Sequence, residues 1–231
     1  MVFSPPLVEG EFVVRLNRFA ARVRVGGREV LAHVPNSGRM TELLVPGAPA
    51  LLAPVPQGVA RKTPYDLTLI RHGDQWVGVD ARLPNALFAE ALADGRLAPF
   101  RPYTAFRREA RWGSSRFDFL LTAADGRVCL VETKSVNLVV GGTALFPDAP
   151  TARGVRHLEA LAASLREGME AAVVFVVQRA DAVRLAPHAG ADPAFAAALA
   201  AAGAAGVMLL AYTCRVTPRE IRIDGAIPVK V

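Results

Sequence analysis

The hydrophobic pattern of the chain changes near residue 81, and this change constrains the fold more than any other feature. Before it, short apolar–polar alternations are separated by glycine and proline, with almost no helical spacing. Short strands joined by tight turns are typical of a small barrel. After it, helical and strand patterns follow one another, which is typical of an α/β domain. We therefore predict a mixed α/β protein, with a small β-barrel over residues 1–80 and an α/β domain over residues 81–231.

The expected elements follow from local spacing. In the first part, Phe19 to Val25 alternates an apolar face with a basic face, and Gly26-Gly27 turns the chain into a second strand. A short helix is expected after Gly38. Further strands are expected over 48–54, 65–71 and 75–80. The second part is expected to contain helices over 84–94, 152–167 and 193–202, and strands over 103–111, 115–122, 127–136, 172–177 and 207–212.

Composition limits the classes of partner. The formal charge is +6 and the isoelectric point about 10.0, which favours a polyanionic partner. Two cysteines cannot supply a disulfide framework or a cysteine-rich zinc site. The uncharged stretch between Asp192 and Arg215 is explained by an alanine-rich helix and a buried strand, so we expect no membrane partner. With no signal-like N-terminal organisation, a cytoplasmic location is expected. A homo-oligomer is left open.

A candidate site lies on two neighbouring strands. Because side chains alternate along a strand, Glu132 and Lys134 share a face and are about 7 Å apart. A two-residue Asp125-Gly126 turn would put Asp118 opposite Thr133, on the other face. A three-residue loop, with Gly126 in the left-handed conformation, puts Asp118 opposite Glu132. We predict the second register, with Phe117, Phe119 and Leu121 buried on the face away from Asp118.

Two opposed carboxylates would repel one another unless a cation lies between them. Their hard oxygens suit Mg²⁺ or Mn²⁺, and Lys134 could orient a water or stabilise charge on a phosphate. Glu90, on the 84–94 helix, is a candidate third metal ligand. The same spacing is also compatible with a surface hairpin that carries an ordinary salt bridge between Glu132 and Lys134. Spacing alone favours this simpler interpretation.

Basic residues in three segments are candidates for nucleic-acid contacts, because arginine interleaved with aromatic residues suits phosphates and stacked bases. A solvated basic surface is the alternative for each segment. On the helix over 152–167, the basic residues are expected on the side away from its buried leucines. The candidates are Arg15, Arg18, Arg22, Arg24, Arg107, Arg108, Arg111, Arg116, Arg153, Arg156 and His157. A turn of unknown role contains Asn36, Ser37, Gly38 and Arg39.

Motifs along nearly the whole chain resemble the sugar fermentation stimulation protein A family. They include Arg18-Phe19, the turn over 35–40, Pro84-Asn85 with Glu90-Ala91, residues 115–120, residues 131–134, Phe146-Pro147-Asp148-Ala149, Thr151-Ala152-Arg153-Gly154 with His157-Leu158, and residues 175–179. Some positions depart from the usual pattern, with Ser37, Arg39, Ser135 and Arg156 replacing other residues.

The resemblance implies an N-terminal OB-like barrel followed by a domain like the PD-(D/E)XK nucleases. It also implies metal-binding roles for Asp118 and Glu132, a catalytic role for Lys134 and an occasional ligand role for Glu90. The expected function is a nucleic-acid-binding protein, with DNA as the expected partner, that hydrolyses phosphodiester bonds with Mg²⁺ or Mn²⁺. The alternative is a non-catalytic DNA-binding regulator of sugar, notably maltose, metabolism genes.

Overall fold

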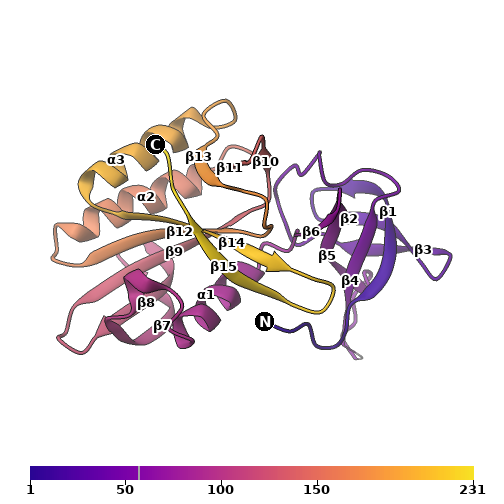
Figure 1. Ribbon diagram of the computed structural model, residues 1–231, viewed down its shortest axis with the longest axis horizontal. Helices are drawn as coiled ribbons and strands as arrows, with labels where there is room; N and C mark the ends of the chain where they lie inside the picture. Colours follow the sequence, from indigo (N-terminus) through magenta and orange to yellow (C-terminus); the bar gives the residue numbers. More distant parts are fainter. Residues whose placement is uncertain (57) are drawn as a thin grey trace.

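The computed structural model describes residues 1–56 and 58–231. Figure 1 shows two parts side by side along the long axis, a barrel formed by the N-terminal strands and an α/β part formed by the rest of the chain. The chain crosses from one to the other just before the first helix, where the hydrophobic pattern changes. No helix in the described residues is long and apolar enough to cross a membrane.

The barrel is a mainly antiparallel sheet that closes on itself through one parallel pairing. Its strands have the order β3-β2-β1-β4-β5-β6, and β3 also pairs with β5, which closes the sheet. Two irregularities in the pairing of β1 with β2 let the long first strand bend around the core, as bulges do. Phe12, Met40, Leu52 and Leu67 fill the interior. The strands are β1 Val8–Asn17, β2 Ala20–Val25, β3 Arg28–His33, β4 Pro49–Pro54, β5 Tyr65–His72 and β6 Gln75–Gly78.

The α/β part is built on a mixed sheet with the order β15-β14-β12-β9-β8-β7. The central strand β12 is apolar along almost its whole length, because helices cover both of its faces. A small separate sheet has the order β10-β11-β13. The strands are β7 Tyr103–Trp112, β8 Ser115–Ala123, β9 Val128–Val136, β10 Val139–Val140, β11 Thr143–Phe146, β12 Glu170–Val177, β13 Arg184–Pro187, β14 Met208–Val216 and β15 Ile221–Ile227.

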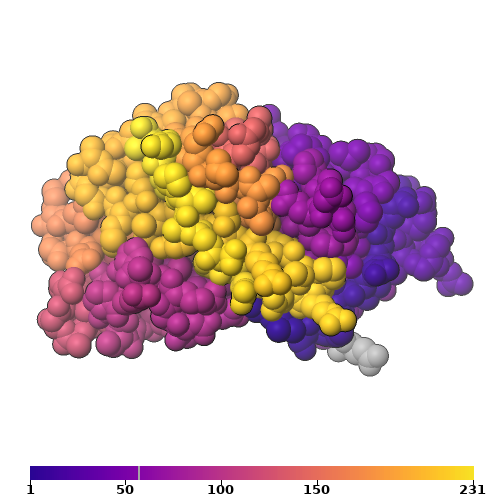
Figure 2. Space-filling view, in the orientation of Figure 1, coloured from indigo at the N-terminus to yellow at the C-terminus, as the bar shows by residue number. Residues whose placement is uncertain are grey.

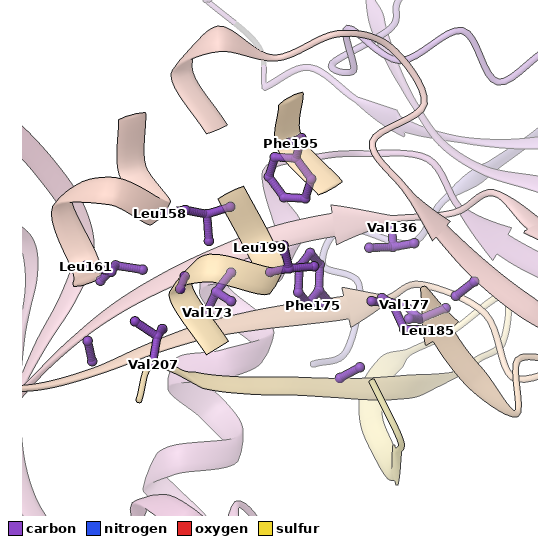
Figure 3. Packing of buried hydrophobic residues seen from close by; sticks show 14 of the residues in the cluster. Val136, Leu158, Leu161, Val173, Phe175, Val177, Leu185, Phe195, Leu199 and Val207 are labelled. Atoms are coloured by element: carbon purple, nitrogen blue, oxygen red, sulfur yellow. The ribbon is translucent and has the colours of Figure 1, made fainter. Parts of the chain in front are cut away.

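Helices α2 (Ala152–Leu165) and α3 (Pro193–Ala205) cover one face of this sheet, and α1 (Leu83–Ala93) packs on the other. Figure 3 shows Leu158 and Leu161 of α2 and Phe195 of α3 above Val173 and Phe175 of β12. Local signals define the helix ends. The side chains of Thr151 and Asp192 cap α2 and α3, and Gly206 ends α3 in the left-handed conformation.

The elements expected from the sequence are present, except for the short helix after Gly38, and the structure contains further strands. The segment after Gly38 is a turn rather than a helix, since residues 41–43 form turns that bond back to Met40. Strand β1 and the strands β10, β11, β13 and β15 were not predicted, because short or exposed strands carry a weak hydrophobic alternation.

The barrel packs directly against the α/β part, as the space-filling view in Figure 2 shows. At this contact the backbone N–H of Gly78 donates to the carbonyl of Gln178 at 2.8 Å. The side chain of Gln178 donates in turn to the carbonyl of Asp80 at 3.0 Å, and it is fully buried. Met40 of the barrel donates its N–H to Asp148 at 2.7 Å. These bonds hold the two parts in a defined arrangement.

Candidate functional site

The hairpin of β8 and β9 has the register predicted from its loop. Phe119 pairs with Val131 and Leu121 with Cys129, so Asp118 lies at the position opposite Glu132. Gly126 has φ +89, the left-handed conformation that the three-residue loop requires. The N–H of Ala123 donates to the carbonyl of Arg127, which closes this loop.

Glu132 and Lys134 meet as expected. Lys134 Nζ donates to Glu132 Oε1 at 2.7 Å, and the two side chains are 12% and 7% exposed. The pair is therefore not the wet surface salt bridge that spacing alone favoured. Glu132 Oε2 is buried and has no hydrogen-bond partner within the described residues. A buried carboxylate oxygen without a donor is costly, so this oxygen is suited to a positively charged ligand.

His157 of α2 completes this cluster. Its Nδ1 atom lies 2.6 Å from Glu132 Oε1, although the contact is poorly aligned for a hydrogen bond. Nε2 accepts from Arg153 Nε at 3.3 Å, which leaves the proton of a neutral imidazole on the side facing Glu132. Burial by itself raises the pKa of Glu132, but the contacts with His157 and Lys134 outweigh it and hold that pKa below its ordinary value.

The prediction that His157 lies on the outer side of α2 is wrong. His157 is 5% exposed and contacts the ring of Phe117, with centroids 5.5 Å apart. The buried side of α2 also contains Gly154, Leu158 and Leu161. Position 157 lies three residues after Gly154 and four before Leu161, so it shares their face of the helix.

Asp118 is held away from this cluster. Its Oδ1 atom accepts from Asn85 of α1 at 2.8 Å, and Oδ2 accepts from the N–H and the hydroxyl of Thr133, each at 2.8 Å. Thr133 and Glu132 point to opposite faces of β9. The Asp118 carboxylate therefore bonds to groups on the α1 side of the sheet, whereas the Glu132 side chain points toward α2. In the structure, Glu132 therefore contacts Lys134 and His157, whereas Asp118 contacts Asn85 and Thr133.

The expected packing of Phe117 is also wrong. Phe117 belongs to the core under α2, while Phe119 and Leu121 belong to the core under α1. Strand parity is broken next to Asp118. On the neighbouring strand, Glu109 has φ 55 and lies between the paired residues Arg108 and Ala110. The register of the β7–β8 pair is the same on both sides of Glu109, so no residue is inserted there.

Glu90 lies elsewhere. It pairs with the N-terminal amino group of Met1 at 2.7 Å and with Arg96 at 3.2 Å. On α1, Glu90 follows Asn85 by five residues, which turns it about 140° around the helix from the side that faces Asp118. Residues 1–56 and 58–231 contain no group of three or more His, Cys, Asp or Glu side chains arranged to hold a metal ion.

A pocket of about 450 Å³ lies at the junction of the barrel and the sheet. Its walls come from both parts of the chain. The lining residues include Arg18, Asn36, Ser37 and Gly38 of the barrel, and Glu132, Thr133, Lys134, Ser135, Asn137, Asp148, Thr151 and Arg153 of the α/β part. The turn of unknown role therefore lies next to Glu132 and Lys134. Asp148 and Asn137 were missed as pocket residues, although the segment 146–149 carries part of the family resemblance.

Arg15 holds this turn in place rather than facing a ligand. Its guanidinium donates to the backbone carbonyl oxygens of Asn17, Arg18, Asn36, Gly38 and Arg39. The N–H of Gly38 also donates to the side chain of Asn36 at 2.8 Å, and Asn36 bonds to Val79. Arg39 contributes its carbonyl to this arrangement and is otherwise exposed.

The remaining basic candidates fall into three groups. Arg116, Arg153 and Arg156 line a second pocket of about 580 Å³ together with His157, and Arg153 lines both pockets. Arg22 and Arg24 pair with acidic residues of the barrel, Glu29 and Glu11. Arg107 and Arg111 are exposed on β7, and Arg108 lies over the ring of Phe119.

Comparison with known proteins agrees with this two-part architecture. The profile described as "SfsA N-terminal OB domain" matches residues 13–79, and "Sugar fermentation stimulation protein RE domain" matches residues 82–220. The chain belongs to the sugar fermentation stimulation protein family. The barrel is the OB-like domain that the resemblance implied, followed by an α/β domain.

Members of the sugar fermentation stimulation protein family match over the full length. The homologue from Moorella thermoacetica is 46% identical over 97% of each chain, and that from Symbiobacterium thermophilum is 47% identical over 99% of this chain and 98% of its own. A solved structure of the Pyrococcus furiosus protein in complex with Ca²⁺ has a TM-score of 0.91 at 31% identity, covering 100% of this chain and 98% of that one.

Proposed function

We propose that the chain binds nucleic acid and hydrolyses phosphodiester bonds with a divalent cation held at Glu132. The observation that carries this proposal is the buried Oε2 atom of Glu132, which has no hydrogen-bond partner in the described part of the chain. It lies in a pocket that also contains Lys134 and basic side chains. A pure binding surface has no need of a buried carboxylate beside a phosphate.

The residues present fit a hard cation. The other oxygen of Glu132 is occupied by Lys134 and His157, so Oε2 is free to coordinate. Mg²⁺ is commonly bound through one or two carboxylates, with waters and substrate phosphates completing its coordination. Mn²⁺ accepts the same oxygen ligands. The Pyrococcus furiosus relative was solved with Ca²⁺, another cation that prefers oxygen ligands.

Asp118 is proposed as the second ligand on the basis of the family resemblance. Both of its oxygens bond to Asn85 or Thr133 in this structure. Oδ2 accepts two hydrogen bonds from Thr133, whereas Oδ1 accepts one from Asn85 and keeps a second lone pair for a cation. Calorimetric titration with Ca²⁺ tests the assignment. Glu132→Gln is expected to abolish binding, and Asp118→Asn to weaken it.

The bound cation would supply Lewis-acid polarisation of the phosphate. The other functions fall to the chain itself. Lys134 Nζ, held by Glu132, can orient the attacking water or stabilise the charge that develops on the phosphate. Arg153 lies beside the cluster and can hold the substrate backbone. The low exposure of Glu132 and Lys134 excludes bulk water, which strengthens each of these electrostatic contacts.

The deciding experiment measures cleavage of DNA and RNA by the purified protein with Mg²⁺ or Mn²⁺, alongside binding measured with Ca²⁺. Lys134→Ala is expected to reduce cleavage by roughly 10²-fold or more while leaving binding nearly unchanged. Arg28→Gln, an exposed barrel residue outside the pocket, is the charge-matched control.

Intact substrate under all of these conditions would contradict the nuclease proposal. Salt-dependent binding without cleavage would instead favour the non-catalytic DNA-binding regulator.

A further inference from the structure

The pocket around Glu132 limits the size of the ligand that can reach this residue. The side chain of Glu132 is 7% exposed, so a scissile phosphate must enter the pocket of about 450 Å³. This volume is within the range of sites that enclose one small ligand, roughly 300–1,000 Å³. It suits one nucleotide with its phosphates. A duplex, whose major groove alone is about 12 Å wide, is far larger than such a site.

One turn of the barrel carries two groups that suit an unpaired strand, and the first of them lines the pocket. Arg18 lines the pocket, and its guanidinium has no acidic partner among the described residues. The next residue, Phe19, is 50% exposed, which is unusual for a large aromatic side chain. Proteins that bind single strands combine basic groups with aromatic rings on which unstacked bases lie.

The position of Phe19 is fixed. Its N–H donates to the side chain of Asn17 at 2.9 Å, and its carbonyl accepts from Val34 at 2.9 Å. Arg15 also holds the carbonyl of Arg18 at 2.7 Å. The ring and the guanidinium are therefore presented by a rigid turn, which lowers the entropy lost when a strand binds.

Basic side chains mark a path by which the rest of the nucleic-acid strand can leave the pocket. Arg153 lines both this pocket and the neighbouring one, where Arg116 and Arg156 are also exposed. Phosphates that flank the bound nucleotide would lie along these guanidinium groups.

We propose that the substrate is single-stranded nucleic acid, with one base stacked on Phe19 and its phosphate held by Arg18 as it enters the pocket. This inference rests on the proposed function for the cleavage step, but the binding of the single strand stands independently of it.

The test measures affinity by fluorescence anisotropy in Ca²⁺ for a short single strand and for its blunt duplex, with DNA and RNA versions of each. The full-length protein is expected to bind the single strand at least tenfold more tightly. Phe19→Ala is expected to weaken this binding by about tenfold or more, and Phe19→Trp to retain it, because stacking depends on the aromatic ring. Leu16→Ala removes a side chain that is 45% exposed on β1, just before the turn that carries Phe19, and serves as the control.

Arg18→Gln is expected to weaken single-strand binding more than Arg28→Gln does. These residues lie near opposite ends of β2, roughly 20 Å apart. Equal affinity for duplex and single strand, together with an unaffected Phe19→Ala variant, would overturn the inference.

The cleavage assay separates the two proposals. Cutting within a blunt duplex as fast as within a single strand would leave the nuclease function standing and refute the single-strand preference. Tight single-strand binding that depends on Phe19, without any cleavage, would support this inference and refute the nuclease.

Discussion

At the scale of single residues, the two oxygens of Glu132 have different surroundings. Oε1 faces Lys134 and His157, while Oε2 is buried and has no hydrogen-bond partner among residues 1–56 and 58–231. The side chain is thereby held in one orientation, with one oxygen neutralised and the other available. A site preorganised in this way loses little energy to rearrangement when a ligand arrives.

The contribution of His157 to this arrangement can be tested by substitution. His157→Ala is expected to destabilise the protein by about 1–3 kcal/mol, because it removes a buried ring that packs on Phe117 and a polar neighbour of a buried carboxylate. His157→Gln retains an N–H donor and is expected to cost less. Urea unfolding of the two variants and the parent chain provides the measurement. An alanine variant as stable as the parent would show that Lys134 alone suffices.

Asp66 provides a pH-dependent prediction. It bonds to Arg82 at 2.7 Å and also to Arg61. Burial raises the pKa of Asp66, but these arginines outweigh it and hold that pKa below its ordinary value. A lowered folded-state pKa stabilises the protein above the unfolded value, about 3.9, and this stability is lost as pH falls through the folded pKa.

We therefore expect Asp66→Asn to be less stable than the parent chain at pH 7, with the difference shrinking below about pH 4. The free energy of unfolding in urea, measured at several pH values, checks this. A difference that stays constant down to the lowest pH would contradict it.

At the scale of elements, the β8–β9 hairpin shows what strand alternation can and cannot predict. Side-chain alternation and the three-residue loop gave the correct register, because both are local properties. They could not predict that Phe117 packs under α2, because this breaks the alternation of side chains along β8. For the same reason, alternation placed Asp118 correctly along the strand but did not predict its bonds to Asn85 and Thr133.

Local sequence patterns could not predict the pocket. Its walls combine Ser37, Glu132 and Asp148, which are far apart in the sequence. Only the docking of the barrel on the sheet brings them together, and no periodicity encodes that docking. The family resemblance identified the same segments without giving their arrangement.

The contact between the two parts can be tested at Gly78. A Cβ atom added there would lie 2.5 Å from Gln178 Oε1 and 2.9 Å from Gln178 Cβ. Gly78→Ala is therefore expected to destabilise the protein by about 1–3 kcal/mol. Gly190→Ala is the control, since its nearest neighbour would be 4.0 Å away. Thermal unfolding distinguishes the two variants, and equal melting temperatures would show that the contact readily adjusts.

At the scale of the whole molecule, the formal charge is +6, and the basic residues behind it differ in what they contact. Arg22 and Arg24 are neutralised by neighbouring acids, and Arg15 is committed to the backbone of a turn. Arg153 and Arg156 line one pocket together with Arg116, which pairs with Glu109 at 3.0 Å. The basic residues at this pocket, rather than those in the barrel sheet, are expected to determine how binding depends on salt.

Arg156→Gln is accordingly expected to weaken single-strand binding and to reduce the slope of log affinity against log salt by about 0.7. Titrations at several salt concentrations measure the slope. Arg22→Gln, which removes an ion-paired arginine, is expected to leave it nearly unchanged. A similar change in both variants would mean that the charge acts through the overall field of the protein.

The shared walls of the pocket have a consequence for chimaeric proteins. If two relatives exchange their barrels at residue 80, each hybrid acquires the donor's Arg18 and Ser37 beside the recipient's Glu132 and Lys134. Preference for a substrate should then travel with the barrel, while the rate of the chemical step stays with the recipient sheet. Recombination between such genes would be able to change what is recognised without rebuilding the machinery that acts on it.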